Sequence, residues 1–267
     1  MDDNINLDRI QTNGNFDFAN LYTEINYNED NIYNDSPLSL NPNECKYLTT
    51  VEFSNAFQSD KVSLSMLCIN CRSLEAHWDS VQELFCNLSS GGLKLDMIAL
   101  TEIFRIRDSQ QYNINGYHSL LFNTRLQNDD GHGGVGIYIN DSFTYTKRED
   151  LSIFIPHVFE SIFFEVQNNK NKPIIVGVVY RPNSAPRADI DMFMSKIIEI
   201  QDKISNENKV AYLMGDYNIN LLNFVTHKKT NDFIDNVISQ GFILYITKPT
   251  RITSNSANTY RPLIFKS

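Results

Sequence analysis

The stretch AYLMGDYNINLL, residues 211–222, is apolar at both ends and polar in the middle. An apolar run stops at Gly215, and Asp216 and Asn218 follow before the chain turns apolar again. In an extended segment, a spacing of two residues places both polar side chains on one side, and Gly215 allows the backbone to turn there. We therefore interpret this stretch as a buried strand that ends in two polar side chains, Asp216 and Asn218.

The acidic residues of the chain are concentrated at its N-terminus. Residues 1–60 contain 11 Asp and Glu against 2 basic residues, a net charge of -9 that equals the net charge of all 267 residues. The remainder is neutral overall, which neither favours nor excludes nucleic acid, since local patches and bound cations offset phosphate charge. Residues 1–45 are rich in Asn and Asp and follow no period of 2 or 3.6. We expect an acidic disordered tail there and one domain over residues 46–267.

The sequence also predicts where the protein resides. Its first residues, MDDNINLDRI, lack the basic segment and apolar run of a signal peptide. No apolar run approaches the roughly 20 residues of a membrane span. The 4 cysteines are too few and too irregularly spaced for a disulfide scaffold. We expect an intracellular protein, nuclear or cytoplasmic, that is not secreted and does not bind a membrane.

Strand-like runs and amphipathic helical windows alternate from residue 62 onward. Strands are predicted over residues 62–70, 95–102, 133–140, 161–166, 173–180, 209–218 and 242–246, and helices over 73–88, 188–204 and 230–241. Consecutive strands between residues 133 and 180 lack an intervening helix. This order disfavours a doubly wound parallel sheet and favours a mixed α/β layered domain.

Polar groups finish four of the predicted strands. Asn70, Glu102 and Tyr180 each end one strand, and Asp216 and Asn218 end a fourth. Strand ends expose side chains from a rigid base, so residues from several ends can converge on one pocket. Taken singly, each has an ordinary explanation as a turn residue, a solvated strand end or the edge of the core.

Taken together, six segments resemble a known family. In chain order they are LCINCRSL, LDMIALTEIF, GGVGIYI, VVYRPN, LMGDYNINLL and KPTRITSNSANT. Their order and spacing are similar to those of the endonuclease/exonuclease/phosphatase family, which has the deoxyribonuclease I-like fold. More narrowly, they resemble the endonuclease domain of LINE-type non-LTR retrotransposons. The resemblance covers about residues 46–267, and six ordered motifs are more specific than any single one. It implies a four-layered α/β/β/α sandwich of two mixed sheets covered by helices, here lacking its last strand.

The resemblance also implies a role for each of the strand-end residues. Glu102 would bind a divalent cation, Mg²⁺ or Mn²⁺, because hard cations prefer carboxylate oxygen, and Asn70 would help to hold that metal or the scissile phosphate. Asp216 would position or protonate reacting oxygens. Asn218 would donate to a phosphate oxygen, and Tyr180 would contact the phosphate. Such groups offset the charge that develops when a phosphodiester anion is attacked.

Three further residues lie beside the matched motifs. Arg181, Thr250 and Arg251 would contact nucleic acid if the resemblance holds. It implies a monomeric phosphodiesterase that acts on duplex DNA, needs no small-molecule cofactor, and leaves a 3′ hydroxyl from which reverse transcription could be primed. Family members choose DNA through surface loops and duplex shape, so the motifs do not predict the target site.

The sequence departs from the family near its end. In TYRPLIF, residues 259–265, Pro262 stands where the resemblance places an Asp, and no Ser-Asp-His element follows. The resemblance implies that the His of this element is the general base, and a general base typically contributes roughly 10² to 10⁴ in rate. We therefore expect a weakly active or inactive enzyme with a C-terminally incomplete domain.

Two other functions stay open. The first is a phosphatase or deadenylase on the same fold, although VVYRPN and the Thr-rich PTRIT favour the retrotransposon branch. The second is a non-catalytic remnant that binds nucleic acid, which Pro262 favours.

Three remaining motifs have structural explanations. Cys68 and Cys71 form a C-x-x-C without a second pair, so packing in the core is favoured over metal or redox chemistry. DDGHGGVG, residues 129–136, precedes a strand rather than a helix and is expected to be a turn rather than a phosphate-cradling loop. Arg125 fits a solvated basic face as well as a phosphate contact.

Overall fold

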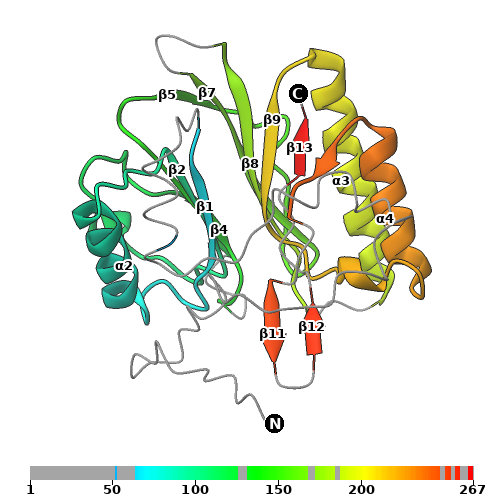
Figure 1. Ribbon diagram of the computed structural model, residues 1–267, viewed down its shortest axis with the longest axis horizontal. Coiled ribbons are helices and arrows are strands. Elements are labelled where there is room, and N and C mark those ends of the chain that lie inside the picture. The colour runs from blue at the N-terminus through cyan, green and yellow to red at the C-terminus, as the bar shows by residue number, and fades with distance from the viewer. Residues whose placement is uncertain are drawn as a thin grey trace.

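Two mixed β-sheets lie face to face in the middle of the molecule, and helices cover their outer faces (Figure 1). The computed structural model describes residues 52, 64–125, 131–167, 172–183, 187–246, 250–253, 256–258 and 264–266. The predicted tail, residues 1–45, and Pro262 lie outside the described residues. What was expected of them stays a prediction.

The first sheet has the strand order β1-β2-β4-β3, in which β1 and β2 are parallel and the other pairs are antiparallel. Its strands are β1 (Met66–Asn70), β2 (Met97–Thr101), β3 (Leu121–Asn123) and β4 (Val135–Ile139). Helix α2 (Trp78–Ser90) covers the outer face, and its Val81, Phe85 and Leu88 share a core cluster with Ile98 and Leu100 of β2.

The second sheet has the strand order β10-β13-β9-β8-β7-β5, with β6 also paired to β7. Only β8 and β9 are parallel among these described pairs. Its strands are β5 (Thr144–Lys147), β6 (Phe154–Ile155), β7 (Phe159–Gln167), β8 (Ile174–Tyr180), β9 (Ala211–Asp216), β10 (Ile243–Leu244) and β13 (Ile264–Lys266).

Helices α3 (Arg187–Glu207) and α4 (Lys228–Ser239) cover the outer face of the second sheet (Figure 1). Short 3₁₀ helices span η4 (Ser109–Tyr112) and η5 (Leu221–Asn223), and a separate hairpin is formed by β11 (Arg251–Thr253) and β12 (Ser256–Asn258). Within the described part of the chain, none of the helices has the length and apolarity to cross a membrane.

Side-chain alternation explains the layers. In β8, Val176 and Val178 point into the core between the two sheets, whereas Ile175 and Val179 point into the core beneath α3 and α4. All four are fully buried. A strand buried on both faces reads as a continuous apolar run, as IIVGVV does. The predicted sandwich of two mixed sheets covered by helices is confirmed, while the lack of a last strand stays a prediction.

Each predicted strand and helix overlaps an observed one, but the boundaries differ. Helix α2 begins at Trp78 rather than at residue 73, because Arg72 and Ser73 have left-handed φ values of 45° and 90° that a helix excludes. Strands β3, β5, β6, β11, β12 and β13 were not predicted. β5 reads Thr-Tyr-Thr-Lys and is exposed along its length at the sheet edge, so it lacks the alternation that signals a half-buried strand.

The C-x-x-C residues pack as expected. Cys71 is fully buried in the cluster beneath α2, and Cys68 packs from β1 against the cluster between the sheets. They therefore contribute to different core layers. Among the described residues, no group of three or more His, Cys, Asp and Glu is placed to hold a metal ion.

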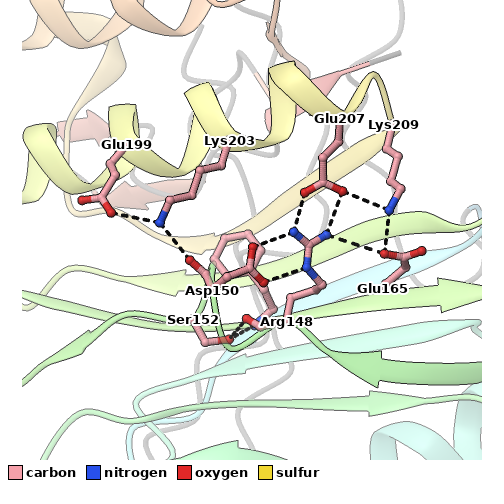
Figure 2. Close-up of polar contacts among 9 residues, drawn as sticks. Arg148, Asp150, Ser152, Glu165, Glu199, Lys203, Glu207 and Lys209 are labelled. Carbon is pink, nitrogen blue, oxygen red and sulfur yellow. Dashed lines mark hydrogen bonds and ion pairs between the residues drawn. The ribbon is translucent and has the colours of Figure 1, made fainter.

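An ion-pair network ties the segment after β5 to the end of α3 (Figure 2). Arg148 donates to Asp150 at 2.7 Å, contacts Glu165 at 3.6 Å and donates to Glu207. Lys209 joins from the start of the next strand, 2.7 Å from Glu165 and 2.9 Å from Glu207. The Arg148 side chain is only 14% exposed. The network thus connects the second sheet to the helix that covers it.

Candidate active site

The carboxyl ends of four strands meet at one end of the sandwich. β1 and β2 run in the same direction in the first sheet, as do β8 and β9 in the second, and these strands contact one another between the sheets. Asn70, Tyr180 and Asp216 are the last residues of β1, β8 and β9, and Glu102 follows the last residue of β2. The structure therefore brings together residues that are far apart in the sequence.

A hydrogen-bonded cluster joins these four side chains. Asn70 Nδ2 donates to Glu102 Oε1 at 2.8 Å and to Asp216 Oδ2 at 2.9 Å. Tyr180 Oη donates to the same Glu102 oxygen at 3.2 Å. One amide thus links carboxylates from two different sheets. Asp216 is 4% exposed and Tyr180 6%, so the cluster lies at the rim of the core rather than on the outer surface.

Burial keeps the Tyr180 phenol protonated. Desolvation raises its pKa well above the ordinary value, and the nearby charges of Glu102 and Asp216 raise it further. A phenol in this environment is a hydrogen-bond donor at every physiological pH. Tyr180 is therefore suited to donate to a negatively charged ligand but not to act as a base.

Asn218 lies just beyond this cluster in a tight turn. Its backbone N–H donates to Asp216 Oδ1 at 3.2 Å, and its side-chain Nδ2 donates to the Arg181 carbonyl at 2.7 Å. The first contact is the Asx-turn geometry that an ordinary explanation of this sequence requires. Asn218 has a φ of 49°, a left-handed value that Asn adopts more readily than most residues.

Arg181 supports the same turn from below. It is 6% exposed, its Nε donates to the Tyr217 carbonyl at 2.7 Å, and its Nη2 donates to the Asn218 carbonyl. Burial lowers its pKa, and the charge of Asp216 acts in the opposite direction. The described hydrogen bonds of the Arg181 side chain are thus with the backbone that carries Asp216 and Asn218. Its predicted contact with nucleic acid stays a prediction.

Gly215 has a different structural role from the backbone turn that the sequence predicts. β9 continues through this residue to Asp216, so the chain does not turn at Gly215. Its φ is 147°, and a Cβ atom there would lie 1.7 Å from the Val179 carbonyl oxygen. Only glycine permits so close an approach of the two strands, which aligns Asp216 with Tyr180.

Glu102 is held in a conformation that glutamate rarely adopts. Its φ is 53°, and left-handed non-glycine residues cost roughly 1–3 kcal/mol, so the surroundings must impose it. Ser73 N–H donates to the Glu102 carbonyl at 2.8 Å, and Leu74 N–H donates to the Ile103 carbonyl at 3.1 Å. These bonds attach the segment after β2 to the segment after β1.

The donor set of the cluster fits a hard divalent cation. Mg²⁺ is commonly held by one or two carboxylates, with waters and substrate phosphate oxygens filling its remaining positions. Glu102 and Asp216 supply two carboxylates joined through Asn70. Thr101, directly before Glu102, is fully buried, and its hydroxyl has no hydrogen-bond partner among the described residues. An unsatisfied buried hydroxyl next to Glu102 in the chain fits a site for an ion and its water.

The other two predicted nucleic-acid contacts lie near one hairpin. Thr250 is half-buried and directly precedes β11, which begins at Arg251. The β11–β12 hairpin projects from the end of the molecule where β8 and β9 finish (Figure 1). The structure thus places this segment at the same end as the cluster, and its contact with nucleic acid stays a prediction.

Comparisons with known proteins define the class of fold. No protein-family model matches the sequence, and neither does any curated protein. Solved structures do match. The catalytic domain of APE2 from Xenopus laevis is similar over 76% of this chain and 82% of that one, with a TM-score of 0.57 and 15% identity. The 3′ phosphatase NExo from Neisseria, bound to a product DNA hairpin, is similar over 76% and 86%, with a TM-score of 0.52 and 13% identity.

A third similar structure has a different kind of substrate in its name. The mannosyl-6-phosphatase Bt3783 from Bacteroides thetaiotaomicron is similar over 76% of this chain and 85% of that one, with a TM-score of 0.53 and 14% identity. Other similar structures are described as endonuclease/exonuclease/phosphatase family proteins. The chain therefore has the fold of that family. Since nucleases and phosphatases share this fold, the choice between them depends on the site.

Proposed function

We propose that this protein is a metal-dependent phosphodiesterase that hydrolyses DNA, the endonuclease domain of a non-LTR retrotransposon. The observation that carries the proposal is the bridge from the Asn70 amide to Glu102 and Asp216, with the Tyr180 hydroxyl on the same Glu102 oxygen. Carboxylates and neutral donors held together on rigid strand ends are the groups that phosphodiester hydrolysis needs.

Each residue of the cluster has a distinct proposed role. Glu102 and Asp216 would hold Mg²⁺ or Mn²⁺, which supplies positive charge to offset the charge of the phosphate. Tyr180 would donate a hydrogen bond to a phosphate oxygen, because burial keeps the phenol neutral. Asn70 orients the two carboxylates, and Asn218 would supply a further amide donor once its own bond to Arg181 is exchanged for one to the substrate.

DNA is the substrate class favoured by two observations. The motifs VVYRPN and PTRIT resemble the retrotransposon branch, and the hairpin that follows Thr250 projects from the end of the molecule where β8 and β9 finish (Figure 1). A polymeric substrate would extend beyond the scissile phosphate at that end. A phosphatase acting on a small substrate would not need contacts there. We propose Arg251 and Thr250 as phosphate contacts, which would position the duplex without reading its sequence.

The rate is expected to be low. Pro262 occupies the place where the resemblance puts an Asp, and a proline side chain neither carries charge nor accepts a hydrogen bond. Loss of one such group from a hydrolytic site costs roughly 10² to 10⁴ in rate. We propose a weakly active or inactive endonuclease whose metal-binding cluster is nonetheless intact.

The test compares variants of the cluster with a matched control. Nicking of supercoiled plasmid is measured under single-turnover conditions with Mg²⁺, alongside Mn²⁺ binding by calorimetry. Glu102→Gln and Asp216→Asn should lose about 10²-fold or more in nicking, because each removes a charge that offsets the phosphate. Glu199→Gln alters a carboxylate on α3 that pairs with Lys196 and Lys203, and it should leave both readouts unchanged.

The outcomes separate the alternatives. Binding of Mn²⁺ by Glu102→Gln with the affinity of the wild type would exclude the proposed site. Turnover of poly(A) or of a phosphoinositide without nicking would select the deadenylase or phosphatase. Binding of duplex DNA by a protein that binds Mn²⁺ neither in the wild type nor in any variant would select the non-catalytic remnant.

A further inference from the structure

We propose that Glu160 is a positioning residue for Glu102. It lies in β7, outside the strand-end cluster, and we infer that it holds the loop Gly131–Gly134, which in turn holds the left-handed residues Glu102 and Phe104 in place. The proposal rests on the proposed metal-binding role of Glu102.

Glu160 forms a buried ion pair with Arg125. Arg125 Nε donates to Glu160 Oε1 at 2.7 Å, and neither side chain is more than 3% exposed. Arg125 is therefore not on a solvated basic face, one of the two explanations open from the sequence. Burial of two charges costs free energy that mutual attraction repays only when further hydrogen bonds complete the arrangement.

The backbone of the glycine loop completes this arrangement. Gly134 N–H donates to Glu160 Oε2 at 2.6 Å. A Cβ atom on Gly133 would lie 2.7 Å from both Arg125 Nη2 and Glu160 Oε2, so the loop rests directly on the ion pair. Gly133 and Gly134 have φ values of 89° and 86°, which other residues rarely adopt. The described part of the motif expected to be a turn, residues 131–136, is a loop that leads into β4 and rests on a buried charge.

The loop passes this constraint to the segment that carries Glu102. Phe104 N–H donates to the Gly133 carbonyl at 2.7 Å, and Ile103 N–H points to the Gly134 carbonyl at 3.4 Å. The Phe104 ring also contacts the ring of His132, with centroids 4.7 Å apart. Phe104, like Glu102, has a left-handed φ, here 61°. Glu102 and Phe104, both left-handed, therefore flank Ile103. The amides of Ile103 and Phe104 bond to the glycine loop.

These contacts give Glu160 a role beyond that of a core residue. The segment after β1 holds the carbonyl groups of Glu102 and Ile103, and the glycine loop holds the amides of Ile103 and Phe104. With both sides attached, the Glu102 carboxylate meets Asn70 and Tyr180 in one orientation. If the glycine loop is released, the left-handed residues can relax and the carboxylate can leave that orientation.

The test uses two double variants that differ in one hydrogen-bond acceptor. Arg125→Met/Glu160→Leu removes both charges and leaves the N–H groups of Gly134 and His157 without their acceptor. Arg125→Met/Glu160→Gln removes the same charges but keeps an acceptor. Hydrogen exchange of the amides of residues 102–105 and the Mn²⁺ dissociation constant are measured for both. Glu165→Leu, which disrupts an ion pair elsewhere in β7, is the control.

We expect the Leu variant to raise exchange in residues 102–105 by tenfold or more and to weaken Mn²⁺ binding by about 10- to 100-fold, the range found for outer residues that orient metal ligands. The Gln variant should lie nearer to the wild type in both. Glu165→Leu should lower the urea midpoint of unfolding and change neither readout. A purely structural role for Glu160 would instead make both readouts follow the urea midpoint.

Unchanged exchange in residues 102–105 of the folded Leu variant would overturn the proposal. If that variant does not fold, Gly133→Ala displaces the loop by collision while both charges remain, and unchanged exchange there has the same meaning. A wild-type protein that binds no Mn²⁺ would contradict the proposed function instead, and the exchange measurement would still decide whether Glu160 holds the segment.

Discussion

The freedom of single residues is most restricted at Gly215. The residues before it in β9 are apolar, and other apolar side chains could replace them, whereas this position excludes every side chain because of the Val179 carbonyl oxygen. The sequence shows a glycine between a buried strand and two polar residues, and a turn is the usual explanation of such a glycine. The true reason, contact with a strand more than thirty residues earlier, has no local signal.

Gly215→Ala is therefore expected to destabilise the protein by about 3 kcal/mol or more, since a Cβ would force β9 away from β8. Unfolding in urea, followed by circular dichroism, measures the loss. Gly91→Ala is the matched control: this glycine follows α2 with a φ of -76°, which alanine adopts readily, so a change within about 0.5 kcal/mol is expected. Equal effects of the two substitutions would contradict the close approach.

Among the elements, α3 depends most visibly on charge. Arg148 and Lys209 hold the Glu207 carboxylate at its C-terminal end against the second sheet (Figure 2). Hydrogen bonds from Arg148 lower the pKa values of Glu207 and Asp150 below their ordinary range. A carboxylate whose folded pKa is lowered stabilises the folded state above its unfolded pKa. That contribution is lost as pH falls through the folded pKa.

Arg148→Met should accordingly lower the free energy of unfolding by about 1–2 kcal/mol at pH 7, a figure reduced for the partial exposure of Asp150 and Glu207. Below about pH 4 the wild type loses the same contribution, so the two proteins should converge. Urea unfolding at both pH values tests this. Lys147→Met removes an exposed pair with Glu149 and should change stability by less than about 0.5 kcal/mol at either pH. A difference independent of pH would mean that Arg148 acts through packing alone.

For the whole molecule, the central fact is that the candidate site is divided between two sheets. Asn70 and Glu102 come from the first sheet, and Tyr180 and Asp216 come from the second. No hydrogen-bond ladder joins the sheets to each other among the described strands. Their relative position is set by the apolar core between them, so packing far from the cluster controls its geometry.

Two adjacent valines make this testable. Val178 and Val179 are both fully buried, but Val178 points into the core between the sheets and Val179 into the core beneath α3 and α4. Each substitution to alanine should cost about 2 kcal/mol through the lost methyl groups and the cavity left behind. Only Val178→Ala should also weaken Mn²⁺ binding, by roughly tenfold, because it alone loosens the contact that aligns the two halves of the site. Calorimetry at a temperature where both variants are folded distinguishes them, and equal Mn²⁺ affinities would count against a site aligned by inter-sheet packing.

Local patterns in the sequence were sufficient to predict the helices, the buried strands and the layered class of fold. Alternation along β8 and the helical spacing of α4 arise from neighbouring residues, and the polar residues that end the strands are visible as breaks in apolar runs. Edge strands such as β5 escaped prediction, since residues exposed on both faces have no hydrophobic period.

Contacts across long separations are what the sequence did not reveal. Asn70 meets Asp216 over a separation of 146 residues, and Arg125 meets Glu160 over 35. The sequence alone shows the types of residue that the cluster needs and the order of the elements that carry them. The packing of the two sheets determines which carboxylates share an amide, which glycine contacts a carbonyl oxygen and which charge holds a loop. It does so because packing brings together groups that no local pattern connects.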